Sequence, residues 1–264
     1  MIHETALVSP DADLAADVAV GPGAIVDAGC VVGAGTTIQA RAVVTGTSVI
    51  GPGTLIGYGA IVGAEPQDVS FGGGPSRVVV GARCRIREYA TVHRGTEAGS
   101  ETVIGDDCFI MVGAHVAHNC VLGDRVTMAN NVLLAGYVEI GAGCFLGGGS
   151  VVHQFTRLGR LAVMRGNTRI GKDVPPFCMA VDTNEVFGVN LAGLKRAGFD
   201  AEARRDIRDA YRTLYHGGLK VGQALDRIEA DFDRPEVAEL VAFVRASKRG
   251  ICGARPLGRK GEED

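Results

Sequence analysis

The sequence predicts an all-β solenoid followed by an α-helical domain, and three observations support this prediction. An aliphatic side chain or Met recurs at every sixth residue from Val8 to Val62, from Val80 to Val92 and from Ile104 to Ile170. The side chain four positions after each of these is mostly small. The chain also contains 39 glycines, which would destabilise any long helix. A strict short repeat is typical of a solenoid, in which each coil buries its apolar face against the next.

The repeat predicts a solenoid over residues 1–176, with one short strand and one inward aliphatic side chain on each flat side of a coil. Two breaks, at 63–79 and 93–103, each span a whole number of repeats, because the register resumes unchanged after them. We therefore interpret both breaks as loops extruded from the solenoid. Glycine often follows the inward aliphatic residue, as at Gly33 and Gly51, and we expect a positive φ angle at these corners.

Most of the seven cysteines occupy the small inward position of a repeat, where free Cys packs as a small apolar residue. The chain has no CxxC motif, and an odd number of cysteines argues against a disulfide framework. We therefore expect these cysteines to be packing residues without a chemical role. They are Cys30, Cys84, Cys108, Cys120 and Cys144.

A different pattern follows the end of the repeat at Ile170. The Pro175-Pro176 pair breaks regular structure. We predict an irregular connector at 177–189, a helical domain at 190–252 and a disordered tail at 253–264. Capping and breaking signals predict four helices in this domain. These are a short helix from Asn190 to Ala197 closed by Gly198, a helix from the N-cap Asp200 to about Tyr215, a third over 220–232, and a fourth from Pro235 to near Gly250.

The composition argues against several classes of protein. A net charge of −3 argues against a general nucleic-acid-binding protein. No stretch approaches the ~18 apolar residues of a membrane span, so we expect no transmembrane segment. The first residues lack the basic and apolar regions of a secretory signal, and we therefore expect a cytoplasmic protein.

The six-residue repeat resembles that of the hexapeptide-repeat proteins, which fold as left-handed parallel β-helices with three repeats per coil; the left hand is implied by this resemblance. With about eighteen residues per coil, residue 118 stacks on Gly136 and then on Gln154. His118 and the His153-Gln154 pair therefore lie along one outer edge, and Gly136 between them exposes a backbone N–H. A histidine beside an unobstructed donor is the minimum for acyl transfer, because it supplies a base for the nucleophile and an oxyanion site.

Short strings in the loops and in the tail are more specific than the repeat. These strings are His93-Arg94-Gly95-Thr96, His115-Val116-Ala117-His118, Met128-Ala129-Asn130-Asn131, Val152-His153-Gln154-Phe155, Asp173-Val174-Pro175-Pro176, Phe187-Gly188-Val189-Asn190 and Gly193-Leu194-Lys195-Arg196. On them the chain closely resembles the UDP-N-acetylglucosamine acyltransferase family over nearly its whole length.

This resemblance implies transfer of a 3-hydroxyacyl group from acyl carrier protein to the 3-position of the glucosamine of UDP-N-acetylglucosamine, the first step of lipid A synthesis. His118 matches the general base, Gly136 matches the glycine whose amide serves as the oxyanion site, and Asp68 matches a residue that binds the acceptor sugar. The other matching positions are His115, His153 and Gln154 in the sugar-nucleotide pocket, Asn190 and Arg196 at the nucleotide, and Gly166 in the acyl-chain pocket, where glycine admits a long chain.

The same resemblance implies the partners of the protein. Family members are homotrimers with active sites between subunits. No metal and no cofactor is implied, because the acyl group arrives on the phosphopantetheine of acyl carrier protein. Basic residues of the helical domain, including Arg204 and Arg205, are either surface charges paired with nearby acids or a face that docks this acidic partner.

The chain departs from the family pattern at positions near the acceptor. Ser70 stands where a lysine is frequent, Asn119 where an aspartate commonly follows the base, and Tyr137 where a histidine is frequent. Ala192 and Ala197 replace a glutamate and an arginine near the nucleotide. These departures leave open the same chemistry on a variant UDP-sugar, such as a 3-amino acceptor.

A metal-dependent hydratase is the alternative from a different class, because a carbonic-anhydrase-like family shares the β-helix and binds zinc through three histidines between subunits. His93, His115 and His118 would be its ligands. The spacing of His115 and His118 differs from the spacing in that family, and the strings of the tail have no place in it.

Overall fold

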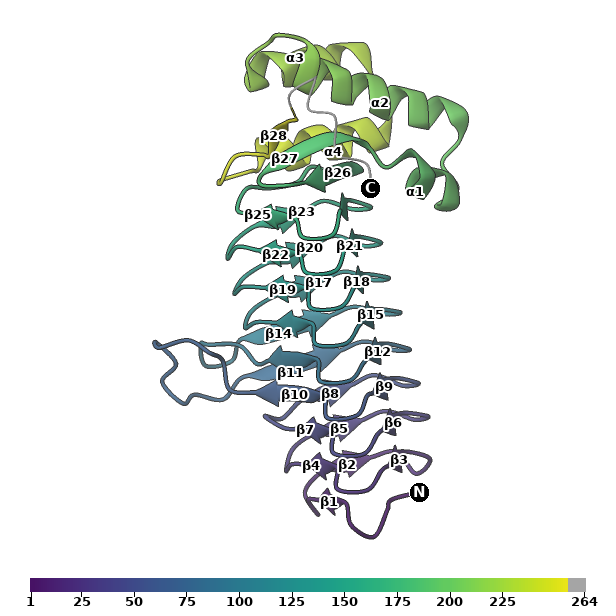
Figure 1. Cartoon of the computed structure of the whole chain (residues 1–264), viewed down its shortest axis with the longest axis vertical. Helices are drawn as coiled ribbons and strands as arrows, with labels where there is room; N and C mark the ends of the chain where they lie inside the picture. The colour runs from purple at the N-terminus through teal and green to yellow at the C-terminus, as the bar shows by residue number, and fades with distance from the viewer. Residues whose placement is uncertain (256–264) are drawn as a thin grey trace.

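The structure, a computed structural model, describes residues 1–255 of the chain. It confirms the predicted fold, a left-handed parallel β-helix that ends in an α-helical domain. Figure 1 shows the β-helix as a long prism with the N-terminus at one end and the helices stacked on the other. None of the helices within residues 1–255 has the length and apolar character needed to cross a membrane.

Three parallel sheets form the sides of the prism, and each coil adds one strand to each sheet. The first sheet contains β1 (Leu7–Val8), β4 (Ile25–Val26), β7 (Val43–Val44), β10 (Ile61–Ala64), β13 (Thr91–His93), β16 (His115–Val116), β19 (Leu133–Leu134), β22 (Val151–Val152) and β25 (Arg169–Ile170).

In the second and third sheets, as in the first, neighbouring strands follow one another in the order of the chain. The second sheet contains β2 (Asp13–Leu14), β5 (Val31–Val32), β8 (Val49–Ile50), β11 (Arg77–Val80), β14 (Glu101–Ile104), β17 (Val121–Leu122), β20 (Glu139–Ile140) and β23 (Arg157–Leu158). The third sheet contains β3 (Ala19–Val20), β6 (Thr37–Ile38), β9 (Leu55–Ile56), β12 (Arg85–Ile86), β15 (Phe109–Ile110), β18 (Thr127–Met128), β21 (Phe145–Leu146), β24 (Val163–Met164), β26 (Cys178–Val181), β27 (Glu185–Val189) and β28 (Gly253–Ala254).

The core of the prism is the predicted column of aliphatic side chains. The second residue of each short strand points inward, and Ile38, Ile56 and Leu134 have no exposed surface. Small side chains such as Ala42 and Cys84 fill the space between them. All seven cysteines are free and buried, as packing residues should be. Burial of apolar side chains on all three sides stabilises each coil only when the next coil is present.

Apart from Gly63, whose φ angle is 95°, the glycines that follow the inward residues do not have positive φ angles, so that expectation was wrong at Gly33 and Gly51. A Cβ on Gly33 would lie 2.8 Å from the backbone nitrogen of Pro52, and a Cβ on Gly51 would lie 2.5 Å from the carbonyl carbon of Gly81. These glycines are needed because the next coil approaches their α-carbon too closely for a side chain. Positive φ angles occur two residues later in the corner, for example at Gly23 and Gly35.

The two extruded loops are shorter than predicted. The strands β11 and β14 include residues 77–79 and 101–103, which we assigned to loops. They pair in parallel from Arg77 opposite Glu101 to Val80 opposite Ile104. The extra strand forms because both loops return to the prism side by side and bond each other's backbone groups.

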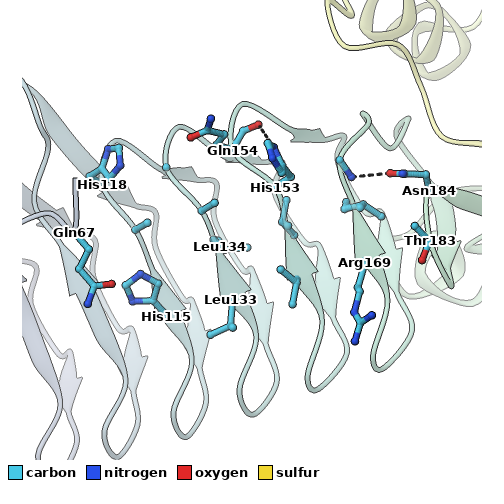
Figure 2. A pocket seen from close by; sticks show the side chains of 17 residues that line it. Gln67, His115, His118, Leu133, Leu134, His153, Gln154, Arg169, Thr183 and Asn184 are labelled. Carbon is cyan, nitrogen blue, oxygen red and sulfur yellow. Dashed lines mark hydrogen bonds between the residues drawn. The ribbon is translucent and has the colours of Figure 1, made fainter. Parts of the chain in front are cut away.

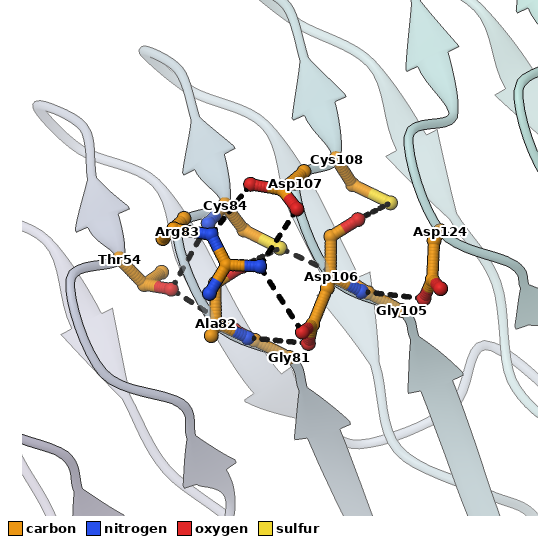
Figure 3. A network of polar contacts seen from close by, with 10 residues as sticks. All are labelled: Thr54, Gly81, Ala82, Arg83, Cys84, Gly105, Asp106, Asp107, Cys108 and Asp124. Atoms are coloured by element: carbon orange, nitrogen blue, oxygen red, sulfur yellow. Dashed lines mark hydrogen bonds and ion pairs between the residues drawn. The ribbon is translucent and has the colours of Figure 1, made fainter. Parts of the chain in front are cut away.

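Aspartate side chains connect successive coils where the loops return to the prism (Figure 3). Asp106 Oδ1 accepts the N–H of Ala82 at 2.8 Å, and Asp124 Oδ1 accepts the N–H of Asp106 at 2.9 Å. Arg83 donates to both oxygens of Asp107 at 2.7 Å. These hydrogen bonds lower the pKa of Asp107, so it stays ionised beside the guanidinium.

The segment 177–189 is not the irregular connector that we predicted. It forms a hairpin in which β26 pairs in parallel with β24, while β27 pairs with β26 in the antiparallel sense. The last coil of the prism leaves backbone groups unpaired, and the hairpin bonds those of the third sheet. Single bridges from Leu158 to Val174 and from Arg169 to Thr183 do the same for the other two sheets.

Four helices follow this hairpin: α1 (Leu191–Arg196), α2 (Ala201–His216), α3 (Val221–Asp231) and α4 (Pro235–Arg245). The helix α2 packs on β27, and the other three helices pack on α2. Asp200 caps α2 by accepting the N–H of Ala203 at 2.7 Å. The helix α4 ends five residues before the predicted Gly250. Residues 253–254 form β28 beside β27, so the predicted disordered tail is wrong at its start; the rest of that segment, 256–264, lies outside the described residues.

Candidate active site

A cavity of about 880 Å³ lies against the outer face of the first sheet (Figure 2). It extends from β16 to β25, and Gln67 of the first extruded loop lies at one end of it. Five predicted site residues line this cavity, which confirms that the coils bring them together. They are His115, His118, Gly136, His153 and Gln154. The exposed side chains of Leu133 and Val151 form an apolar part of the remaining wall.

His118 lies at the corner between the first and second sheets, and its side chain is largely buried. Its imidazole lies against the α-carbon of Gly136 in the next coil. Among residues 1–255 no backbone carbonyl accepts the N–H of Gly136. This N–H therefore stays available at the cavity wall, beside the imidazole, for an oxyanion.

Asp68 comes from the first extruded loop and faces His118. Its Oδ2 lies 3.6 Å from His118 Nε2. Its Oδ1 accepts hydrogen bonds from the backbone N–H and the hydroxyl of Ser70, at 2.9 and 2.8 Å. The hydrogen bonds from Ser70 hold the pKa of Asp68 below its usual range. An ionised carboxylate thus stands beside the imidazole, in the place predicted for acceptor binding.

His93 and His115 form a pair of neutral imidazoles behind His118. Their ring centroids are 4.9 Å apart in an edge-to-face arrangement, and His115 Nδ1 lies 2.7 Å from Thr91 Oγ1. Burial, reinforced by the neighbouring His115 and His118, lowers the pKa of His93 to about 4. Burial also lowers the pKa of His115. The cost of desolvation keeps both rings uncharged at neutral pH.

His153 and Gln154 lie two coils above His118 on the same edge. His153 Nδ1 is 3.2 Å from the backbone oxygen of Gln154 and 3.4 Å from Nη2 of Arg249. Arg249 follows α4 and donates through Nε to the backbone oxygen of Gly171 at 2.9 Å. The six-residue repeat gives no signal for this arginine, because only the folded tail brings residue 249 back to the β-helix.

Four predicted site residues do not line the cavity within one chain: Asp68, which faces His118 from the first extruded loop, Gly166, Asn190 and Arg196. Gly166 lies on the corner between the third and first sheets, where the backbone oxygen of Gly148 would be 3.3 Å from a Cβ at residue 166. The Asn190 amide caps α1 by accepting the N–H of Gly193, and it donates to the backbone oxygen of Leu161 on the third corner. Arg196 is exposed at the end of α1.

The cluster around His118 also contains residues that the sequence pattern did not assign to the site. Asn119, Tyr137 and Glu97 join its polar contacts. Two of them are positions where the chain departs from the family pattern. Glu97, in the second extruded loop, had no signal in the repeat.

The arrangement of acids and imidazoles does not favour a metal site. Within residues 1–255 no three His, Cys, Asp or Glu side chains are placed to hold a metal ion. His93, His115 and His118 therefore do not form a ligand set within this chain, and the hydratase alternative gains no support.

Comparisons with known proteins identify the family of the chain. The family model "Udp N-acetylglucosamine O-acyltransferase; Domain 2" matches residues 173–252, and the model "Bacterial transferase hexapeptide (six repeats)" matches residues 101–136. Two relatives are named acyl-(acyl-carrier-protein)–UDP-N-acetylglucosamine O-acyltransferase. The relative from Paraburkholderia phymatum is 44% identical and the one from Thermodesulfovibrio yellowstonii is 39% identical, and each alignment covers 95% of this chain and 98% of the relative.

Solved structures agree with the relatives. UDP-N-acetylglucosamine acyltransferase from Campylobacter jejuni matches with a TM-score of 0.92 and 32% identity, over 97% of this chain and all of that chain. The Bacteroides fragilis enzyme of the same name matches with a TM-score of 0.91 and 34% identity, over 95% of this chain and 99% of that chain. The chain therefore belongs to the acyl-(acyl-carrier-protein)–UDP-N-acetylglucosamine O-acyltransferase family.

Proposed function

We propose that this protein transfers a 3-hydroxyacyl group from acyl carrier protein to the 3-hydroxyl of the glucosamine in UDP-N-acetylglucosamine, the first step of lipid A synthesis. The observation that carries the proposal is the contact between the His118 imidazole and Gly136 at the cavity wall. A base and a free backbone N–H stand side by side there, as acyl transfer requires. The names of the relatives support the choice of both substrates.

In the proposed reaction, His118 Nε2 takes the proton of the sugar hydroxyl as its oxygen attacks the thioester carbonyl. The tetrahedral intermediate places its negative oxygen at the N–H of Gly136, which stabilises it. Collapse of the intermediate breaks the carbon–sulfur bond, and the thiol of phosphopantetheine leaves with the proton from His118. Asp68 stabilises the imidazolium while it carries that proton.

We propose that the acyl chain lies along the apolar wall of the cavity. Leu133 and Val151 stack in register between His115 and Arg169 and form an outer strip of this wall. Both are partly exposed in the single chain, and a second copy that covers them would exclude water from the chain. The wall spans the three strand spacings from β16 to β25, about 14 Å, which suits a medium-to-long 3-hydroxyacyl group.

We propose that the active enzyme is a homotrimer whose sites lie between subunits. The predicted site residues of one chain are spread over three different corners of the prism, and Gly166 and Asn190 do not line the cavity of their own chain. A neighbouring copy could present either corner to it. The seven free, buried cysteines are usual for a reducing compartment, and the compartment we propose is the cytoplasm.

We propose that acyl carrier protein docks on a basic surface of the helical domain. Arg204, Arg205 and Arg208 line a cavity of about 300 Å³ on α2. The nearest acid to Arg205 is Glu202 at 3.5 Å, and both side chains are more than half exposed. Exposed arginines of this kind steer an acidic partner more than they stabilise the fold.

Mass spectrometry of reaction products tests the proposed function. The purified protein is incubated with 3-hydroxyacyl carrier proteins of several chain lengths and with UDP-N-acetylglucosamine, and His118→Ala serves as the control. We expect an O-acylated product from the wild type and a loss of about 100-fold or more in the variant. If no product forms at any chain length, the proposal is wrong. A product formed equally by His118→Ala would exclude His118 as the base.

A further inference from the structure

The side chain of Asn119 determines which of the two ring nitrogens of His118 carries the proton. Asn119 Oδ1 lies 3.0 Å from His118 Nδ1, and it also accepts the backbone N–H of Thr96 at 2.9 Å. A backbone N–H can only donate, so the amide atom in this position is the oxygen. His118 Nδ1 must then be the protonated nitrogen, and Nε2 keeps its lone pair.

Asn119 is itself fixed in position. Its φ angle is 59°, which is in the left-handed region that Asn and Asp tolerate better than other side chains. Its backbone N–H donates to Thr102 Oγ1 at 2.8 Å. The backbone of Asn119 is therefore held in place on the corner of the coil. Its side-chain Oδ1 points to His118, and its Nδ2 points to the second extruded loop.

A carboxylate stands behind the amide. Asn119 Nδ2 donates to Glu97 Oε2 at 3.4 Å, and the hydroxyl of Tyr137 donates to Glu97 Oε1. The hydrogen bond from Tyr137 lowers the pKa of Glu97. Burial, together with Glu97, raises the pKa of Tyr137 to about 12. At neutral pH Glu97 is therefore the anion and Tyr137 is the donor.

The ring of Tyr137 completes the enclosure of the imidazole. Its centroid lies 5.3 Å from that of His118 in an edge-to-face contact, and Asp68 faces the opposite nitrogen at 3.6 Å. His115, a neutral imidazole, lies behind the ring. The two acids near His118 thus differ in position: Asp68 lies on the side of Nε2, and Glu97 lies beyond Asn119 on the side of Nδ1.

We propose that Glu97 and Asn119 are positioning residues for His118. Asn119 holds the imidazole in the tautomer that protonates Nδ1, and the Glu97 carboxylate holds Asn119 and stabilises the imidazolium that forms when Nε2 takes a proton. The carboxylate acts through the amide, because Asn119 occupies the position next to the ring. This inference rests on the proposed function, in which His118 is the base.

Kinetics of Glu97→Gln test the proposal, because glutamine keeps the shape of the side chain and removes its charge. We expect kcat to fall about 10- to 100-fold, the range found when the outer partner that orients a metal-bound histidine is removed. The KM for UDP-N-acetylglucosamine should not change. The acid limb of the pH profile of kcat/KM should move to lower pH, because the imidazolium has lost a nearby anion. Glu101→Gln is the matched control, since Glu101 lies at the end of the same loop and pairs with Arg77.

Rescue by a second substitution separates this role from a structural one. In the double variant Glu97→Gln/Asn119→Asp, the new carboxylate can accept hydrogen bonds from both the N–H of Thr96 and the Nδ1–H of His118. Aspartate also tolerates the positive φ angle. We expect kcat to recover most of its loss. A double variant as slow as Glu97→Gln would overturn the proposal, as would a Glu97→Gln enzyme with the wild-type kcat and pH profile.

Nitrogen NMR of the histidine rings tests the tautomer without any substrate. In the wild type we expect a proton on His118 Nδ1 and none on Nε2 at neutral pH; a proton on Nε2 would overturn the assignment. The two kinds of failure are distinguishable. A wild type that makes no product contradicts the proposed function, whereas product formed equally fast by Glu97→Gln overturns only the role of Glu97.

Discussion

Gly136 provides the space that the imidazole of His118 occupies. A Cβ on residue 136 would lie 2.4 Å from Cε1 and 2.5 Å from Nε2 of the ring, well inside van der Waals contact. The two residues are eighteen positions apart and meet because successive coils stack in register. The glycine is therefore required twice in the proposed mechanism, once for its N–H and once for its lack of a side chain.

Gly136→Ala should inactivate the enzyme, because the new methyl group displaces the imidazole from its position. We expect kcat to fall by about 100-fold or more, since a shift of about 1 Å in a catalytic group can have that effect. Steady-state kinetics measure the loss of kcat, and thermal unfolding measures the change in melting temperature that the clash causes. In His118→Ala/Gly136→Ala the clash is gone, so the melting temperature should return toward that of His118→Ala while activity stays absent. An active Gly136→Ala enzyme would contradict this account.

Burial of His93 should make the fold less stable in acid. The pKa of His93 is about 4 in the folded protein and 6.5 in an exposed histidine. Between these values the unfolded chain binds a proton that the folded chain does not bind, so stability is lost as the pH falls from 6.5 toward 4. From pH 7 to pH 5 we expect a loss of about 2 kcal/mol from this residue.

Urea unfolding of wild type and His93→Gln at pH 7 and pH 5 measures this contribution. The wild type should lose more stability than the variant across this interval. His216→Gln is the control, because His216 is exposed at the end of α2. Equal losses in wild type and His93→Gln would show that the buried imidazole does not govern the acid response.

Charge reversal on the basic surface should weaken the interaction with acyl carrier protein. For Arg204→Glu/Arg205→Glu we expect the KM for the acyl carrier protein substrate to rise at least about fivefold, while kcat at saturation is retained. The wild-type KM should rise with ionic strength and the KM of the variant should respond less. Arg227→Glu on α3 is the control, since Arg227 pairs with Asp231 at 2.6 Å on another helix. An unchanged KM in the double variant would exclude this surface.

Gly166 should leave room for a long acyl chain in the site that it forms with a neighbouring subunit. Gly166→Met should shift the preferred substrate to a shorter 3-hydroxyacyl chain, because its side chain would extend from the corner into the chain's path. Assays across chain lengths measure this shift. Gly148→Met is a closely matched control, because a Cβ at either position would meet one backbone oxygen at 3.3 Å on the same corner. If both variants prefer the same acyl-chain length, Gly166 does not belong to the acyl-chain pocket.

The sequence predicts the β-helix well, since a repeat of six with small inward side chains admits few other structures. The same register predicts that His118, Gly136 and Gln154 stack on one edge, because a parallel coil places residues eighteen apart above one another. Helix starts at Asp200 and Pro235 also follow from local chemistry, where a side-chain cap or a first-turn proline acts within a few residues.

Other features depend on contacts that no local pattern encodes. Glu97 meets Tyr137 forty positions along the chain, and only the folded path of the extruded loop brings them together. The hairpin at 177–189 forms because the last coil has unpaired backbone groups, which is a property of the end of the prism and not of the hairpin's own sequence. The absence of a side chain on Gly51 reflects the approach of the following coil and not a φ angle.

The hairpin and its two accompanying bridges have a consequence for how the protein behaves in concentrated solution. A parallel β-helix has no intrinsic length limit, because the open end of one prism offers the backbone groups that the start of another prism requires. At the C-terminal end β26, Val174 and Thr183 occupy those groups on all three sides. The hairpin and the two bridges thus cover a surface that would otherwise direct end-to-end growth into fibres, so the segment that completes the fold also prevents end-to-end association.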